Sequence, residues 1–151
     1  MIRTGDKIPD FMLPDQDGND FHMHKIVGKK NLVIYFYPKD ESVACTMEAC
    51  KFRDYFEDFI NFDCDVIGIS GDSIESHQRF SRNLGLPFVL LSDQNNNIRT
   101  KFGVPKDLFG LIPGRVSYIV DKNGVVQHVV NSQLNIKKHV NEAISSLKKI
   151  A

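Results

Sequence analysis

Residues 32–50 read LVIYFYPKDESVACTMEAC, and this stretch decides the fold. Its first six residues form an unbroken apolar run of β-branched and aromatic side chains, which is typical of a strand buried on both faces of a sheet. Pro38 ends the run, because proline has no N–H to donate to a strand ladder. A short polar loop follows, and a helical pattern begins at Cys45. The stretch therefore predicts a buried strand, a loop, and a helix that opens with a cysteine.

The rest of the chain alternates strand and helix patterns around this unit. Residues 11–23 read as a hairpin around Asp17-Gly18, and residues 121–124 predict a second hairpin turn. A helix is expected over 45–60, with an apolar face formed by Phe52, Phe56, Phe59 and Ile60. Further strands are expected at 66–70, 89–91, 116–120 and 125–130, and further helices at 73–84 and 135–150. The element order β-α-β-α-β-β-α predicts an α/β domain of the thioredoxin-like class, with a mixed central sheet, helices on both faces and an N-terminal β-hairpin.

The length of 151 residues fits a single domain over residues 1–151 with a sizeable core. Nineteen basic residues balance nineteen acidic ones, so there is no charge excess of the kind that binds nucleic acid or anionic lipid. The N-terminus, MIRTGDKIPDF, lacks the apolar core of a secretory signal, and no apolar stretch approaches the ~20 residues of a membrane-spanning helix. We expect a cytoplasmic protein. A mature organellar form, such as a plastid one, is the alternative, because a removed transit peptide leaves no trace.

Cys45 lies at the predicted start of a helix, a position that lowers the pKa of a thiol. The first turn of a helix has unpaired N–H groups and the positive end of the macrodipole, and both favour the thiolate over the thiol. The thiolate is the nucleophilic form of cysteine. Ser42, three residues upstream, can direct its hydroxyl at an oxygen atom bound near the sulfur. The segment therefore predicts an activated cysteine beside a hydrogen-bonding site for a small oxygen compound.

Cys50 lies five residues further along the same predicted helix. Five residues of ideal helix give ~7.5 Å of rise and ~500° of rotation, so the two side chains point apart. A disulfide needs α-carbons within about 7 Å, so the pair can bridge only if the first turns unwind. Spacing alone leaves two interpretations open. Cys50 is either a buried core cysteine or the partner of Cys45 in a locally unfolded oxidised form.

Residues 35–50 resemble the active-site motif of the peroxiredoxins (AhpC/TSA family), Pro-x-x-x-Thr/Ser-x-x-Cys. Pro38, Ser42 and Cys45 occupy its three fixed positions. The spacing to Cys50 is similar to that of the peroxiredoxin Q (bacterioferritin comigratory protein) branch, which commonly carries its resolving cysteine five residues after the peroxidatic one. The likeness extends along nearly the whole chain, through VIGISGDSIESHQRF (66–80), LPFVLLSD (86–93) and DLFGLIPGRVSYIVDKNGVVQ (107–127).

This resemblance implies an antioxidant, thiol-dependent peroxidase that reduces hydrogen peroxide and organic hydroperoxides. Cys45 would be oxidised to a sulfenic acid, Cys50 would resolve it as an intramolecular disulfide, and thioredoxin or a similar dithiol would reduce that disulfide. The family's catalytic arginine maps to Arg115 in PGRVSYIVD. Ser42 would stabilise developing charge, and Pro38 would shield the sulfur from water. The resemblance implies no metal, haem or flavin, and this branch is often monomeric.

The chain departs from the family pattern at 42–44, where Ser-Val-Ala replaces the usual Thr-Pro-Gly; the hydroxyl is kept, but we expect a looser or reshaped loop. Cys64 is expected to be structural, with a resolving role as the alternative. Glu48 either orients the arginine or is solvated. The apolar loop 108–113 is expected to pack in the core; alternatively, it lines a peroxide pocket and docks the reductant.

Two other function classes use the same fold. A thiol–disulfide oxidoreductase would have two residues between its cysteines, whereas this chain has four between Cys45 and Cys50. A non-catalytic binding module would not need Pro38, Ser42, Cys45 and Arg115 together.

Overall fold

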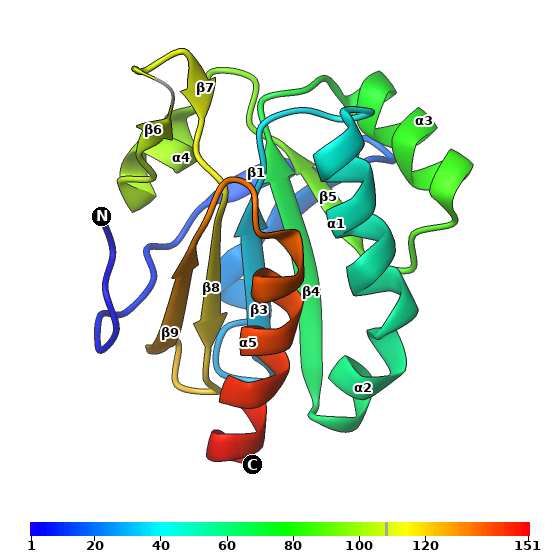
Figure 1. Ribbon diagram of the computed structural model, residues 1–151. Coiled ribbons are helices and arrows are strands. Elements are labelled where there is room, and N and C mark those ends of the chain that lie inside the picture. Colours follow the sequence, from blue (N-terminus) through cyan, green and yellow to red (C-terminus); the bar gives the residue numbers. More distant parts are fainter. Residues whose placement is uncertain (108) are drawn as a thin grey trace.

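The computed structural model describes residues 1–107 and 109–151, which build a five-stranded mixed sheet (Figure 1). The strand order is β5-β4-β3-β8-β9. The first three of these strands are parallel, β8 is antiparallel to β3, and β9 is antiparallel to β8. The strands are β3 (Asn31–Phe36), β4 (Cys64–Ser70), β5 (Val89–Ser92), β8 (Val116–Val120) and β9 (Val126–Asn131). The predicted thioredoxin-like order of elements around a mixed sheet is confirmed.

Helices cover both faces of the sheet, but unequally. One face carries α1 (Val43–Asp54), α2 (Phe56–Asn61), α3 (Ile74–Leu84) and α5 (Ile136–Ile150). The opposite face is covered by the short α4 (Asn97–Phe102), the 3-10 turn η1 (Met23–Lys25) and apolar side chains of the N-terminal segment. Both crossovers from β3 to β4 and from β4 to β5 step in the same direction along the sheet. Right-handed crossovers of this kind place their helices on the same face.

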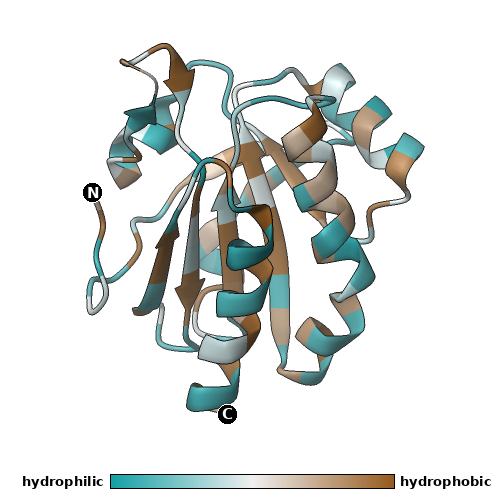
Figure 2. Ribbon diagram, in the orientation of Figure 1, coloured by the Kyte–Doolittle hydropathy of each residue, from teal (hydrophilic) through white to brown (hydrophobic). Residues whose placement is uncertain are grey.

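Strand β3 lies at the centre of two apolar cores. All six of its residues are buried. Val33 and Tyr35 point into the core under the long helices, whereas Leu32, Ile34 and Phe36 point into the opposite core. Figure 2 shows hydrophobic colouring along the central strands and hydrophilic colouring on the outward side of α5. The expected strand buried on both faces is confirmed.

The N-terminal hairpin pairs β1 (Met12–Pro14) with β2 (Asp20–His22) in antiparallel register. Its turn is held by the Asp15 carboxylate, which accepts hydrogen bonds from the backbone N–H groups of Asp17 (2.9 Å) and Asn19 (3.0 Å). Gly18 adopts the left-handed φ of 83° that this turn requires. The expected hairpin is confirmed.

Some elements of the structure differ from the sequence prediction. The single helix expected over 45–60 is two helices, because the backbone leaves helical geometry at Tyr55 (φ −101°, ψ 14°). Phe52 and Phe59 still reach the core, but Ile60 is 56% exposed, so it does not belong to the predicted apolar face. Helix α4 and the small ribbon of β6 (Lys106–Asp107) and β7 (Ile112–Pro113) were not expected. Among the described residues, no helix is long and apolar enough to cross a membrane.

Candidate active site

Cys45 is buried in the first turn of α1, with 1% of its surface exposed. The helix begins at Val43 and Ser42 is its N-cap, so the Ser42 hydroxyl oxygen accepts a hydrogen bond from the Cys45 N–H (3.3 Å). The Ser42 hydroxyl itself donates to the carbonyl of Lys39 (3.2 Å). The predicted position of Ser42 beside Cys45 is therefore found. Its proton must turn away from Lys39 before it can reach a bound oxygen atom.

Arg115 lies against the sulfur of Cys45, although the two residues are seventy positions apart. Its Nη2 donates to Cys45 Sγ (3.3 Å), its Nη1 to Glu48 Oε1 (2.6 Å), and its Nε to the carbonyl of Gln133 (3.0 Å). The sheet brings them together: β3 ends at Phe36, which pairs with Val116, the first residue of β8. The loop to Cys45 therefore leaves the sheet at the same edge at which Arg115 enters it.

Glu48 is fully buried one turn after Cys45, so the solvated alternative is wrong. Its Oε1 pairs with Arg115, while its Oε2 has no hydrogen-bond partner within the described part of the chain. His139 Nδ1 lies 3.8 Å from that Oε2 atom. His139 Nε2 is 2.7 Å from the carbonyl of Ser132, and its Nδ1 is 2.7 Å from the hydroxyl of Ser117. Sequence reasoning missed His139; its signal was its place three residues after Ile136 on the buried face of α5.

Burial shifts the ionisation of Glu48 and His139 in opposite senses. Loss of water raises the pKa of Glu48 from 4.5 to about 7, although the Arg115 guanidinium pulls it down. Loss of water lowers the pKa of His139 to about 4, so its imidazole is neutral at pH 7. A neutral ring that donates from Nε2 to Ser132 has its Nδ1 lone pair free to accept from Ser117.

These shifts predict how stability changes with pH. Between pH 4.5 and 7 the folded state holds a proton on Glu48 that the unfolded state has lost, so a rise in pH through this window costs on the order of 3 kcal/mol of unfolding free energy. His139 acts in the opposite sense: its stabilising effect is lost as the pH falls from 6.5 towards 4. In Glu48→Gln we expect only the His139 slope to remain.

Urea unfolding of both proteins at pH 5 and pH 8 measures this difference. The wild type should lose more unfolding free energy than Glu48→Gln between pH 5 and pH 8. The contribution of His139 to the pH dependence is the same in both proteins, so it cancels in the comparison. Parallel pH profiles for the two proteins would contradict the assignment of a raised pKa to Glu48.

A cavity of about 380 Å³ opens beside the Cys45–Arg115 pair. It is lined by Pro38, Lys39, Ser42, Ala44, Ile112, Pro113, Arg115 and Gln133. Two of these residues, Ser42 and Arg115, are the ones that bond to Cys45. The expected core packing of the loop 108–113 is wrong for Phe109 and Leu111, which are exposed. Leu108 lies outside the described residues.

Cys50 and Cys64 are both free thiols, as is Cys45. Cys50 is half-buried within α1, which continues without a break from Val43 to Asp54, so the expected separation from Cys45 in an intact helix is found. Cys64 is buried at the start of β4, and burial raises the pKa of its thiol. Its Sγ donates to the carbonyl of Asp65 (3.4 Å). A buried thiol that stays protonated is a poor nucleophile, which favours a structural role for Cys64.

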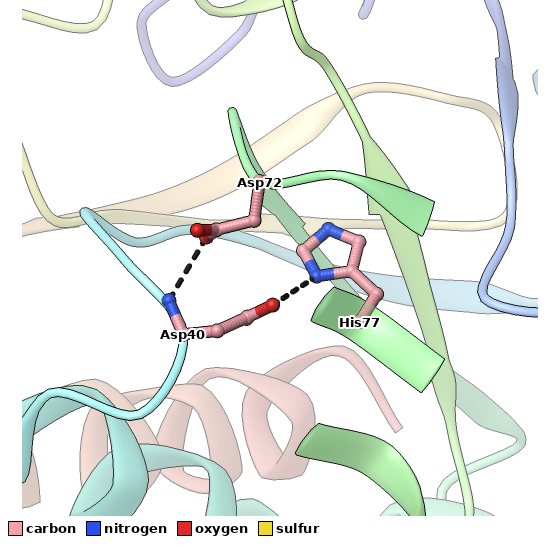
Figure 3. A group of neighbouring side chains, drawn as sticks. All are labelled: Asp40, Asp72 and His77. Carbon is pink, nitrogen blue, oxygen red and sulfur yellow. Dashed lines mark hydrogen bonds and ion pairs between the residues drawn. The ribbon is translucent and has the colours of Figure 1, made fainter. Parts of the chain in front are cut away.

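Asp40, Asp72 and His77 cluster behind the active-site loop (Figure 3). Their ligand atoms are close enough to surround a cation, but they already bond to protein groups. His77 Nδ1 lies 2.6 Å from Asp40 Oδ2, and His77 Nε2 lies 2.9 Å from the carbonyl of Leu91. Asp72 Oδ2 accepts from the backbone N–H of Asp40 (2.9 Å), and Asp40 Oδ1 from the hydroxyl of Tyr37 (2.6 Å). The cluster therefore anchors the loop at Asp40 and does not suit a metal.

A thioredoxin-like sheet that presents a buried cysteine at a helix start, bonded to a buried arginine beside a cavity, defines a thiol peroxidase. Comparison with known proteins agrees: the sequence pattern of the AhpC/TSA family matches residues 4–129. The chain belongs to the AhpC/TSA family, in its peroxiredoxin Q branch.

Curated relatives include chloroplastic peroxiredoxin Q of Sedum lineare, 48% identical over 99% of this chain and 80% of its own length. The chloroplastic peroxiredoxin Q of Arabidopsis thaliana is 48% identical, over 97% of this chain and 68% of its own length.

Solved structures show the same fold. The peroxidoxin BcpB of Mycobacterium tuberculosis superposes with a TM-score of 0.92 at 30% identity, covering 100% of this chain and 99% of its own. The bacterioferritin comigratory protein of Xanthomonas campestris, which was studied for its alkyl peroxide reduction activity, has a TM-score of 0.84 at 27% identity. The match covers 93% of this chain and 91% of that one.

Proposed function

We propose that Cys45 is the peroxidatic residue of this peroxidase and that Cys50 resolves it. The observation that carries the proposal is the 3.3 Å contact between Arg115 Nη2 and Cys45 Sγ in the first turn of α1. A guanidinium remains charged at physiological pH, so it stabilises a thiolate and can also donate to a peroxide oxygen. The cavity beside this pair is lined by Arg115 and Ser42, so a peroxide bound there meets the two side chains that bond to Cys45.

In the first step, the Cys45 thiolate attacks the terminal oxygen of the peroxide. The S–O bond forms as the O–O bond breaks, and the hydroxide or alkoxide that leaves takes up a proton to become water or alcohol. Arg115, the Ser42 hydroxyl and the Cys45 N–H stabilise the charge that develops on the two oxygens. Pro38 lines the cavity and limits the access of water to the sulfur.

In the second step, Cys50 attacks the sulfenic sulfur, a disulfide forms and water leaves. The intact helix over Val43–Asp54 keeps the two thiols apart, so its first turns must unwind before they meet. Thioredoxin or a similar dithiol then reduces the disulfide by exchange. The exposed apolar side chains of Val43, Met47, Phe109 and Leu111 belong to the two segments that supply Ser42, Ala44 and Ile112 to the cavity wall, and the reductant is proposed to dock on them.

The cavity favours organic hydroperoxides as substrates alongside hydrogen peroxide. Ala44, Ile112 and Pro113 give its wall an apolar character that accommodates an alkyl group. The alkyl peroxide reduction activity of the Xanthomonas campestris relative supports the same substrate class.

We further propose that residues 1–151 act as a single-domain monomer. We propose the cytoplasm as its location, with an organelle as the alternative. The chloroplastic names of the plant relatives favour the organelle.

Replacement of the second cysteine tests the proposed cycle. In Cys50→Ser we expect one rapid turnover with hydrogen peroxide, after which the enzyme stops, because Cys45 sulfenic acid has no partner. Stopped-flow oxidation followed by intact mass should find one added oxygen atom per chain. Cys64→Ser is the matched control, since it also removes a free thiol, and it should cycle with thioredoxin like the wild type.

Full multi-turnover activity of Cys50→Ser with thioredoxin would exclude the resolving role. Loss of cycling in Cys64→Ser instead would transfer that role to Cys64. Disulfide exchange without any peroxide consumption by the wild type would favour a thiol–disulfide oxidoreductase.

A further inference from the structure

A second buried arginine, Arg99, lies behind the active site and has no part in the steps above. It belongs to α4 and is 5% exposed. Its Nη1 donates to the carbonyl of Gly114 (2.7 Å) and its Nη2 to the carbonyl of Tyr37 (2.8 Å). The guanidinium carbon also lies 5.5 Å from the centre of the Phe36 ring.

The two carbonyls belong to the two segments that carry the active site. Tyr37 precedes Pro38 and the loop that leads to Cys45, and Gly114 directly precedes Arg115. The ladder between β3 and β8 ends at the pair Phe36 and Val116. Arg99 therefore joins the two segments at the point where strand pairing stops.

The Arg99 guanidinium is not buried in order to form an ion pair. Among residues 1–107 and 109–151 its guanidinium donates only to these two carbonyls, and the nearby Asp93 carboxylate accepts instead from the backbone N–H groups of Ile98 and Arg99. Burial lowers the pKa of Arg99 to about 10, against the opposing effects of Asp93 and Cys45, so the side chain stays charged at neutral pH. A buried charge whose hydrogen bonds go to two neutral carbonyls is costly for stability. This cost indicates that the position of the two carbonyls matters for function.

We propose that Arg99 is a positioning residue of the peroxidase reaction: by bridging the carbonyls of Tyr37 and Gly114, it sets the distance between the Cys45 sulfur and the Arg115 guanidinium. This inference rests on the catalytic roles proposed above for Cys45 and Arg115. It predicts that loss of the bridge harms the step that needs both groups in register, which is attack on a peroxide. Simple alkylation of Cys45 needs only the thiolate, so it should be affected far less.

Arg99→Met and Arg99→Lys test the proposal in the full chain. In Arg99→Met we expect the second-order rate of hydrogen peroxide reduction to fall about 10²-fold, since a misplacement of about 1 Å costs this much. The rate of Cys45 alkylation by iodoacetamide should fall less than about threefold. Lysine keeps the charge but can reach only one carbonyl, so Arg99→Lys should lie between Arg99→Met and the wild type.

Arg53→Met is the matched control. Arg53 also donates to a backbone carbonyl, that of Leu84 (2.7 Å), but it lies at the far end of α1 from the active site. Its replacement should reduce the unfolding free energy, measured in urea, without changing either rate. Circular dichroism shows whether each variant is folded, and Arg99→Lys keeps the test available if Arg99→Met is not.

Two results would overturn the role of Arg99. One is a peroxide rate in both variants within about threefold of the wild type, and the other is an equal fall in the peroxide and alkylation rates. These differ from a failure of the proposed function, in which Cys45→Ser itself would still reduce peroxide.

Discussion

Cys45→Ser should abolish peroxide reduction and leave the fold intact. Serine is close to cysteine in size and fits the buried position, where the side chain is 1% exposed. The serine hydroxyl, however, stays protonated at neutral pH. Among the described residues the hydrogen-bond partners of Cys45 are Arg115 and Ser42, and neither is a base that could activate the hydroxyl as a nucleophile. The expected rate is that of the uncatalysed reaction.

Peroxide consumption under pseudo-first-order conditions, with urea unfolding alongside, checks this expectation. Cys64→Ser serves as the comparison, because it too replaces a buried thiol by a hydroxyl. If Cys45→Ser retained activity and Cys64→Ser lost it, the nucleophile would be Cys64.

Arg115→Met should lower the second-order rate with hydrogen peroxide by about 10²–10³-fold, the usual cost of a lost donor to a developing oxyanion. The guanidinium is the only group described that contacts the Cys45 sulfur and the Glu48 carboxylate together. Its loss also leaves Glu48 buried without a cation, and the pKa of that carboxyl should rise further, so that it holds a proton at neutral pH.

The double variant Arg115→Met with Glu48→Gln separates two explanations of this loss. If activity falls because a donor to the peroxide is missing, the double variant should be as slow as Arg115→Met. Recovery of most of the rate in the double variant would show that the buried Glu48 carboxyl group, left without Arg115, was the cause. Stopped-flow oxidation of Arg115→Met, Glu48→Gln and the double variant at one pH gives the comparison.

The sequence predicts those parts of the site that depend on local pattern. The apolar run of β3, the proline after it and the cysteine at a helix start lie within 19 residues, and their order is enough to predict how they are arranged. Arg115 could be placed only through resemblance to a family. Nothing in its own neighbours says that β8 pairs with β3, because strand pairing is a property of the whole sheet.

Helix α4 and the contacts around Glu48 could not be predicted in this way. A helix of six residues completes fewer than two turns, so it shows no apolar period, and its buried residues, Arg99 and Phe102, differ in character. Glu48 and His139 are polar residues on buried helix faces. Arg115 pairs with Glu48 Oε1, and Ser117 and Ser132 bond to the two ring nitrogens of His139. These partners come from distant parts of the chain, so local sequence does not reveal them.

The anchorage of Asp40 limits how far the active-site sulfur can travel. Its side chain and N–H are held by Tyr37, Ser76, His77 and Asp72, none of which belongs to α1, so these bonds survive when the first turns of that helix unwind. Cys45 then remains connected to the anchored Asp40 by five residues, and five extended residues reach at most about 17 Å. The oxidised sulfur therefore stays within this distance of Asp40, on the same face of the molecule, where a reducing partner can bind.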